Sequence, residues 1–290
     1  MRDFVILTDS CCDLPAALAD ELDIVVLPLS VLIGEESFKN YLDGREIGFK
    51  AFYDRIRGGA MPTTSAVSVG DFEDAMRPIL ASGRDILYLG FSSALSTTCQ
   101  SAMIAAAELQ EKYPDRTIRV VDTLCAALGQ GLLVWHACRK RDEGMGLNEL
   151  AQWVEDNKLH VCHWVTVDDL THLKRGGRIS ATTAMVGTML NIKPIIIMDD
   201  TGHLSNVGKI RGRKAAIEHL VQKMLETKGD YDNETVFIGH GDCPEDAAIL
   251  EKLVKERCGV RHVYTGYVGP VIGAHTGPGV LVVFFLGTHR

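Results

Sequence analysis

The chain has 290 residues, is 46% hydrophobic and carries a formal net charge of -8, so it can build the cores of two domains or one large one. Its acidic balance argues against broad nucleic-acid contact, which needs a basic face to replace phosphate counterions. The first residues are too briefly apolar for a signal peptide, and no apolar run approaches the ~20 residues of a membrane helix, so we expect a cytoplasmic protein without a membrane span.

The first half of the chain alternates short β-branched runs with amphipathic stretches. Ser68 and Asp71 have the spacing of a capping box, which predicts a helix over about 69–82. Another helix is expected over about 95–112. This alternation is typical of βαβ units and predicts a mostly parallel sheet with flanking helices. The predicted strands of this half cover residues 4–8, 24–32, 85–90 and 118–122.

The pattern changes after a polar patch at 139–144. A run at 192–198, a turn at 199–202 and the residues from His203 onward predict a β-hairpin with a four-residue loop, and hence antiparallel pairing. We therefore expect an α/β chain of two domains, with an N-terminal α/β domain over 1–158 and a C-terminal α+β domain with a mixed sheet over 159–290. Further predicted elements are helices at 213–227 and 245–257 and strands at 235–239, 262–266 and 280–286.

Positive charge gathers between residues 170 and 216 of this acidic chain. Only Asp199 and Asp200 oppose eight basic residues there, and like charges repel unless an anion or an acidic partner offsets them. Glycines beside Arg178 and Arg211 favour close contact with such a partner over simple solvation. The basic residues are Lys174, Arg175, Arg178, Lys193, Lys209, Arg211, Arg213 and Lys214.

Motifs for nucleotides and metals fail on their spacing. The segment from Gly202 to Lys209 has five residues between its glycines instead of four, and Ile210 stands where a phosphate loop has Ser or Thr. Gly129 and Gly131 lie inside a helical pattern, which favours helix packing over a dinucleotide fingerprint. The eight cysteines include no Cys-x-x-Cys pair and no zinc-type spacing occurs, so we expect buried reduced thiols, no metal and no cofactor.

The segment Gly90-Phe91-Ser92-Ser93-Ala94 leaves three roles open. It is a near match to the Gly-x-Ser-x-Gly turn that exposes a serine nucleophile between a strand and a helix. In that case His275 is the base and Asp242 its orienter, as in a serine esterase. The same hydroxyl pair equally caps a helix or binds an anion through backbone N–H groups.

Other polar segments bear on ligand binding. The hydroxyl cluster at 63–65 stands just before a helix, which predicts a loop with a spare capping residue. His275 lies between glycines in a predicted close-packed loop, a setting that favours contact with a ligand. His240 and Asp242 lie in a glycine-rich segment that favours a turn over catalysis. Spacing alone does not bring these side chains together.

Seven short motifs follow one another along the chain: Asp9-Ser10, Thr64-Ser65, Ser92-Ser93 with Leu95-Ser96, Val121-Asp122, Leu173 to Ile179, Leu190 to Pro194, and Gly273 to Gly279. Together they resemble the DegV family over about residues 4 to 287. The resemblance implies two α/β domains that hold one fatty acid between them. In bacteria, fatty acid kinase uses such subunits to present the acid to a separate ATP-binding protein.

The resemblance implies that this chain is the binding subunit, without an ATP site of its own. Its implied partners are a long-chain fatty acid and an ATP-binding kinase subunit, with at most transient contact with a membrane surface. Arg211 is similar to a family arginine that works with the kinase and the phosphate. By the same resemblance, the fatty-acid carboxylate is held by Thr64, Ser65, Ser93, His275, Thr276 and Arg178.

The chain departs from the family pattern beside two of these motifs. Ala66 and Val67 replace Gln-Pro after the Thr-Ser pair, while the hydroxyl groups of the head-group motifs are kept. Phe91, Ala94 and Thr97 are bulkier than the family's residues at their positions. These substitutions bear on the shape of the pocket and therefore on the acyl chain length that it accepts.

Overall fold

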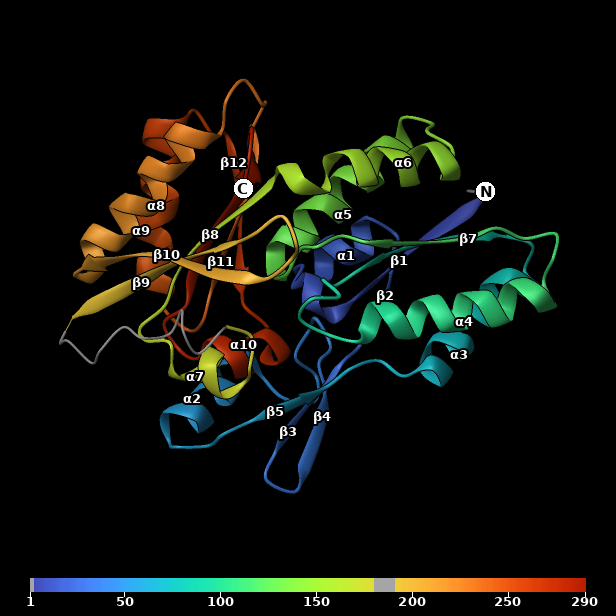
Figure 1. Cartoon of the computed structure of the whole chain (residues 1–290), viewed down its shortest axis with the longest axis horizontal. Helices are drawn as coiled ribbons and strands as arrows, with labels where there is room; N and C mark the ends of the chain where they lie inside the picture. The colour runs from blue at the N-terminus through green and yellow to red at the C-terminus, as the bar shows by residue number, and fades with distance from the viewer. Residues whose placement is uncertain (1–2, 180–190) are drawn as a thin grey trace.

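The computed structural model describes residues 3–179 and 191–290, so Ser180 and Leu190 of the segments above lie outside the described residues. The described residues form three sheets with helices packed around them (Figure 1). No helix among them is long and apolar enough to cross a membrane.

The first sheet is parallel, in the order β2 (Val25–Leu27), β1 (Phe4–Asp9), β6 (Asp85–Gly90) and β7 (Ile118–Asp122). Helices α5 (Ala127–Asp142) and α6 (Leu147–Asn157) cover one face, and α3 (Val69–Ala81) and α4 (Thr98–Lys112) cover the other (Figure 1). The predicted capping box opens α3, where the Ser68 side chain accepts from the Asp71 N–H at 3.1 Å. The predicted parallel sheet with flanking helices is confirmed.

The second sheet is mixed, in the order β10 (Leu204–Arg211), β9 (Ile192–Met198), β8 (Val161–Thr166), β13 (Leu281–Leu286), β11 (Thr235–His240) and β12 (His262–Tyr267). Helices α8 (Arg213–Thr227) and α9 (Pro244–Cys258) pack on it, and α5 packs on β8, β11 and β13 as well as on β6 of the first sheet. The predicted hairpin is present as β9 and β10. Its loop spans 199–203, because β10 begins at Leu204 rather than at His203.

A small antiparallel sheet corrects two predictions. Its order is β4 (Glu36–Lys39), β3 (Ser30–Ile33) and β5 (Thr63–Ser65). The single strand predicted over 24–32 is wrong: it is divided at Pro28, which has no N–H to donate to a ladder, and its halves join different sheets. The loop predicted at 63–65 is wrong as well, since Thr64 pairs with Val31. Helix α10 (Pro270–Thr276) packs on β3 and β5 and against α2 (Phe49–Arg57) and α7 (Thr171–Arg175).

Two glycines of α5 allow this helix to approach its neighbours closely. A Cβ at Gly129 would lie 2.2 Å from Nε2 of His163, and a Cβ at Gly131 would lie 2.6 Å from the carbonyl oxygen of Cys12. Neither position has room for a side chain. The predicted helix-packing role of both glycines is confirmed.

The cysteines are unpaired thiols. All eight are free, and seven of them are buried, as expected. Burial raises the pKa of Cys99 to about 12 and that of Cys125 to about 11, so both are protonated at neutral pH.

Candidate functional site

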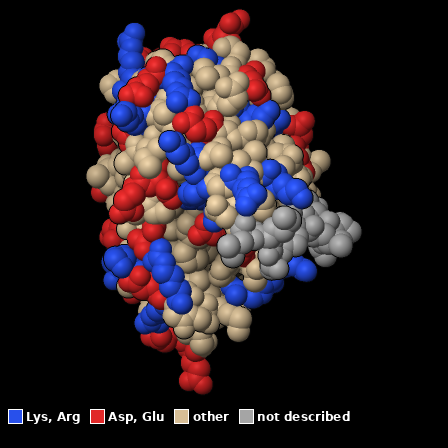
Figure 2. Space-filling model, turned by 90° about the vertical axis from the view of Figure 1, so that its left-hand side faces the viewer, with Lys and Arg blue, Asp and Glu red and all other residues tan. Residues whose placement is uncertain are grey.

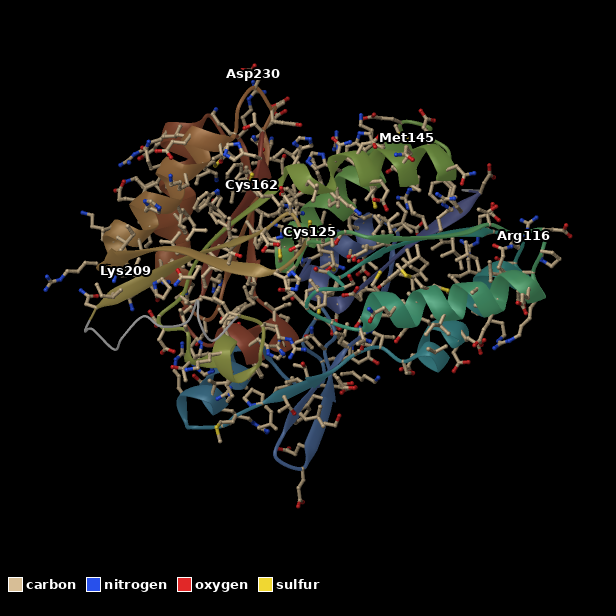
Figure 3. The ribbon with its side chains drawn as sticks, in the orientation of Figure 1. Arg116, Cys125, Met145, Cys162, Lys209 and Asp230 are labelled. Carbon is tan, nitrogen blue, oxygen red and sulfur yellow. The ribbon has the colours of Figure 1, made fainter. Side chains whose placement is uncertain are left out.

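A cavity of about 420 Å³ takes its walls from the small and the mixed sheets, from the loop after β6 of the parallel sheet, and from α5 and α10. Polar side chains from β5, the loop after β6 and α10 lie in its wall, while β8, β9 and β13 contribute mainly apolar ones. Cys125 precedes two lining residues at the start of α5, and Figure 3 shows it in the middle of the molecule. The apolar part of the wall includes Leu29, Phe91, Ala126, Ala127, Val165, Ile196, Met198, Leu204, Val268, Val271, Val280, Val282 and Phe284.

Thr64 and His275 meet in the wall of this cavity. Oγ1 of Thr64 and Nε2 of His275 share a hydrogen bond of 2.8 Å across 211 residues of sequence. Nδ1 of His275 is buried without a hydrogen-bond partner among the described residues. Burial lowers the pKa of His275 from 6.5 to about 4, and the positive charges of Arg178 and Arg175 add to the shift, so the ring is neutral at neutral pH.

The predicted location of His275 in a loop is wrong. The residue lies in the last turn of α10, which begins with Pro270 in a position suited to the first helical turn. Gly277 ends the helix with a φ of 76°, a conformation that side chains disfavour. The glycines around His275 therefore terminate a short helix, and the packing of this helix on β5 fixes the ring beside Thr64.

Arg178 connects the end of α7 to the loop after β6. Its Nε donates to the carbonyl oxygen of Leu95 at 3.1 Å, and a terminal nitrogen donates to the carbonyl oxygen of Gly176. A Cβ at Gly176 would lie 2.1 Å from Nδ1 of His275, so this position has no room for a side chain. The glycine therefore allows Arg178 and His275 to lie at the same end of the cavity.

The other predicted carboxylate-binding residues also line this cavity. The backbone N–H of Ser93 donates to Oδ1 of Asp122 at 3.2 Å, which holds the loop after β6 against the end of β7. Thr276 donates its hydroxyl to the carbonyl oxygen of Ile272 at 3.2 Å, so it is partly engaged within α10. Ser65 is exposed at the end of β5. All six residues implied by the resemblance thus belong to one cavity wall.

Asp9 supports the loop that carries Ser93. Its Oδ2 accepts from the N–H of Phe91 at 2.9 Å and from the hydroxyl of Tyr88 at 2.7 Å, while Oδ1 accepts from the N–H of Cys11 at 3.0 Å. Burial raises the pKa of Asp9, and these hydrogen bonds oppose the rise. The carboxyl group therefore joins the end of β1 to the start of the loop after β6.

His163 is a lining residue that sequence reasoning missed. The N–H of Ala126 donates to its Nε2 at 3.2 Å, so the ring proton lies on Nδ1, which bonds the carbonyl oxygen of Val161 at 3.0 Å. The ring packs edge-on to Phe284 with centroids 5.2 Å apart. Both polar atoms are satisfied, so His163 presents a neutral ring to the apolar part of the cavity. An isolated histidine in an apolar strand gave no signal of this position.

The predicted esterase constellation of Ser92, His275 and Asp242 does not assemble. Ser92 is fully buried and donates its hydroxyl to the carbonyl oxygen of Gly202 at 2.8 Å. Asp242 accepts from the hydroxyl of Tyr267 at 3.1 Å and pairs with an arginine of α2. The Ser92 hydroxyl thus binds the hairpin loop, and His275 is hydrogen-bonded to Thr64 instead. Asp242 also has a φ of 54°, which confirms its predicted place in a turn.

Arg211 lies away from the cavity wall. It is exposed at the end of β10, and Lys209 on the same strand points outward at the left edge of Figure 3. Figure 2 shows this side of the molecule, on which Lys and Arg side chains gather at mid-height. Two other cations of the basic segment pair with carboxylates: Lys193 with Asp168 at 2.6 Å and Arg213 with Asp246 at 2.8 Å.

Metal and nucleotide motifs gain no support from the fold. Residues 3–179 and 191–290 contain no group of three or more His, Cys, Asp and Glu side chains that could hold a metal ion. The segment from Gly202 to Lys209 is the end of the hairpin loop and most of β10, rather than a loop between a strand and a helix.

Comparison with known proteins identifies the family. The model of the DegV family, a family described as uncharacterised, matches residues 3–288. A DegV domain-containing protein of Clostridium perfringens is 46% identical over 287 residues, which cover 99% of this chain and 98% of that protein. This chain therefore belongs to the DegV family, and the predicted membership is confirmed.

Two solved structures share the fold. A fatty-acid-binding DegV family protein from Thermus thermophilus has a TM-score of 0.87 and 31% identity, with 99% of this chain and 100% of that chain covered. A stearic-acid-binding protein from Eubacterium ventriosum has a TM-score of 0.88 and 26% identity, with 98% of each chain covered. The predicted α/β fold of the DegV type is confirmed.

Proposed function

We propose that this chain binds one long-chain fatty acid, with the acyl tail in the cavity and the carboxylate at its polar end. The observation that carries the proposal is the meeting of Thr64, His275 and Arg178 at one end of a cavity whose remaining wall is largely apolar. The fatty-acid-binding relatives from Thermus thermophilus and Eubacterium ventriosum support this ligand class. The proposal keeps the division into domains 1–158 and 159–290, with the lipid between them, and requires no cofactor.

The tail supplies the affinity in this account. Burying a methylene group contributes roughly 0.8 kcal/mol, so a chain of about sixteen carbons gains about 12 kcal/mol before the cost of ordering. The aliphatic side chains of β8, β9 and β13 provide the surface that the tail needs. Thr166 ends β8 on the side that leads to α7, and Leu281 begins β13 on the side that follows α10. His163 and Phe284 lie three residues farther along these strands, toward the opposite ends. We assign the methyl end of the tail to them.

The head group sets the orientation. A carboxylate removed from water needs partners, because an unpaired buried charge costs several kcal/mol or is neutralised by protonation. His275 is neutral, so the positive charge comes from Arg178. With its proton on Nε2, His275 donates to Thr64 and leaves the hydroxyl hydrogen of Thr64 for the carboxylate. Ser65, Ser93 and Thr276 line the same cavity and complete the proposed head-group site.

We further propose that the bound acid is presented to a separate ATP-dependent fatty acid kinase. A carboxylate oxygen attacks the γ-phosphorus of ATP, and acyl phosphate and ADP are the products. This chain supplies no nucleotide site in the proposal, and the exposed Arg211 meets the kinase or the transferred phosphate. The complex works in the cytoplasm, with transient contact with a membrane surface where the acid is collected.

Lipid extraction tests the binding proposal. Protein purified under native conditions should release about one fatty acid per chain into organic solvent, as quantified by mass spectrometry. Ser93→Ala and His275→Ala should retain less lipid, because each removes a polar partner of the carboxylate. Ser37→Ala is the matched control, since Ser37 is exposed on β4 and does not line the cavity. An empty extract from wild-type protein that also fails to take up oleate would overturn the proposal.

The kinase partnership needs its own experiment. The purified chain with ATP and oleate should form no acyl phosphate until an ATP-binding subunit, recovered by affinity capture from the cytoplasm of the same cells, is added. Turnover by the purified chain alone would contradict the assignment as a binding subunit. Lipid binding without any captured ATP-binding protein would leave the lipid proposal standing and refute the kinase partnership.

A further inference from the structure

A second cavity, of about 200 Å³, lies on a different part of the molecule. It is formed by the segment before α1, the segment after β4, the first residue of α2 and the end of β12. Among the described residues, none lines both this cavity and the proposed lipid cavity. Its wall consists of Asp13, Leu14, Pro15, Asn40, Leu42, Phe49, Thr265, Gly266, Tyr267 and Gly269.

Asp13 is the unusual residue of this wall. Its side chain is buried, with the residue 7% exposed, and neither carboxyl oxygen has a hydrogen-bond partner in the part of the chain that the structure describes. Its backbone has a φ of 51°, and its N–H bonds the carbonyl oxygen of Ser10 at 3.4 Å. The turn therefore holds a carboxyl group in the cavity wall, where burial without a partner is unfavourable.

Gly269 allows this carboxyl group to approach the backbone. A Cβ at Gly269 would lie 2.5 Å from Oδ1 of Asp13 and 3.3 Å from Nδ2 of Asn40, so both side chains converge on this glycine. Asn40 is buried, and its Nδ2 donates to the carbonyl oxygen of Ser10 at 3.5 Å. One acidic and one amide side chain thus form the polar side of the cavity.

The described part of the cavity wall supplies no positive charge. No Lys or Arg is among the lining residues that the structure describes. Burial raises the pKa of Asp13 well above its ordinary value; the nearby amide of Gly269 opposes the rise without reaching hydrogen-bond geometry, and the negative charge of Asp9 adds to it. A cation placed in the cavity would offset the charge that this carboxyl group carries when ionised.

The opposite side of the cavity is apolar and aromatic. The ring of Phe49 stacks on that of Tyr267, with centroids 5.4 Å apart and an interplanar angle of 23°. Pro15 and Leu42 add aliphatic surface. Aromatic faces attract cations and pack well against the carbon atoms next to an ammonium group.

We propose that this cavity binds a small primary ammonium compound with a short apolar body, whose ammonium group pairs with Asp13 and whose carbon atoms pack on Phe49 and Tyr267. The described wall residues offer no positive charge to an anion, and a purely apolar ligand would leave the buried carboxyl group without a partner. At ~30 Å³ for each water-sized group, the volume suits a ligand of about six or seven non-hydrogen atoms.

A titration with 3-methylbutylamine tests the proposal, with 3-methylbutan-1-ol as the neutral analogue of the same shape. Amide chemical shifts of the full chain report binding residue by residue at neutral pH, where the amine is protonated. Wild-type protein should show saturable shifts around 13–15 and 265–269 with the amine, and at least about tenfold weaker binding of the alcohol. A factor of ten is the low end of what a charge-assisted hydrogen bond contributes.

Variants identify the partner of the ammonium group. Asp13→Asn keeps the shape of the side chain and should weaken binding of the amine at least about tenfold. Asp43→Asn is the matched control: it removes an exposed carboxylate, paired with Arg45 at 2.8 Å, beside the lining residue Leu42. It should bind the amine as the wild type does. Phe49→Ala, which removes an aromatic wall, should weaken binding even if Asp13→Asn fails to fold.

Several outcomes would overturn the proposal. Absence of saturable shifts in the wild type would refute the site itself. Equal affinity for amine and alcohol, or unchanged binding in a folded Asp13→Asn, would refute the assignment of an ammonium ligand. Equal weakening by Asp13→Asn and Asp43→Asn would show a general surface charge effect and refute pairing with the buried carboxyl group.

Discussion

The hydroxyl group of Thr64 is the part of the proposed head-group site that a single substitution removes most cleanly. Thr64→Val keeps the shape of the side chain and deletes the atom that bonds Nε2 of His275 at 2.8 Å. Nδ1 of the same ring already has no partner among the described residues. The substitution therefore removes a donor to the carboxylate and also the hydrogen bond that orients the histidine.

Both effects have a predictable size. A hydrogen bond to a charged group contributes about 1.5–3 kcal/mol, so the affinity for a long-chain fatty acid should fall roughly tenfold to a hundredfold. Leaving the ring of His275 unpaired should lower the free energy of unfolding by about 1–3 kcal/mol. Displacement of a fluorescent fatty acid from delipidated protein measures the first effect, and urea unfolding of the delipidated protein measures the second.

Thr63→Val is the matched control. Thr63 is adjacent on β5, is exposed, and is not among the described residues that line the cavity. The control should bind the fatty acid as the wild type does. If Thr64→Val binds equally well, or if the two variants lose the same affinity, the assigned role of Thr64 in the head-group site is refuted.

Three further predictions address the partner, the histidine and the tail. Arg211→Ala should retain lipid but slow acyl-phosphate formation by the kinase subunit. Arg261→Ala, at an exposed site beside the start of another strand, should retain lipid and leave the rate unchanged. Lost lipid with normal turnover in Arg211→Ala would contradict the role assigned to Arg211. The pKa of His275 is lowered from 6.5 to about 4, so the stability due to its neutral form is complete above pH 6.5 and is lost as the pH falls through about 4. Between pH 6.5 and about 4, the free energy of unfolding measured with urea should therefore fall more for the wild type than for His275→Gln. Equal losses would refute the lowered pKa of His275. Gly129→Ala places a methyl group 2.2 Å from the present position of His163 Nε2, so it should lower stability by about 1–3 kcal/mol and weaken binding of the longest acyl chains; a variant as stable as the wild type would show that the helix moves aside.

Local sequence patterns identified the regular elements of the large sheets. The predicted strands at 85–90 and 118–122 and the helix at 213–227 coincide with β6, β7 and α8. Each combines a clear apolar period with a defined start or stop, which is the information that a local pattern carries. The helix expected from 95 begins at Thr98 instead, because the residues before it form a turn that lines the cavity.

The small sheet escaped prediction because its strands are short and depend on tertiary pairing. Residues 63–65 are hydroxyl-bearing and exposed or half-buried, and only their pairing with β3 makes them a strand. The predicted loop around His275 failed for a similar reason. The glycines of this segment have different roles: a Cβ at Gly273 would lie 2.6 Å from the Tyr53 hydroxyl, so this position needs close packing, while the φ of 76° at Gly277 ends the helix.

The candidate site itself could not be derived from spacing. Thr64 and His275 are 211 residues apart, and they meet only because α10 packs on β5. The family resemblance supplied the six lining residues, while the serine-elbow pattern suggested Ser92, whose side chain is turned into the core. His163 and Asp13 were missed, because the burial of a polar side chain and the lack of a partner are properties of the folded chain.

The central claim is that one acyl chain lies in the cavity with its carboxylate at Thr64 and its methyl end at His163 and Phe284. A crystal structure of the chain loaded with a fatty acid that carries a bromine atom at the methyl end tests this directly, because the anomalous signal locates one end of the ligand without bias. The account predicts a single bromine peak beside His163 and Phe284 and carboxylate density within hydrogen-bonding distance of Thr64. A bromine peak beside Thr64, or a ligand bound outside the cavity, would contradict it.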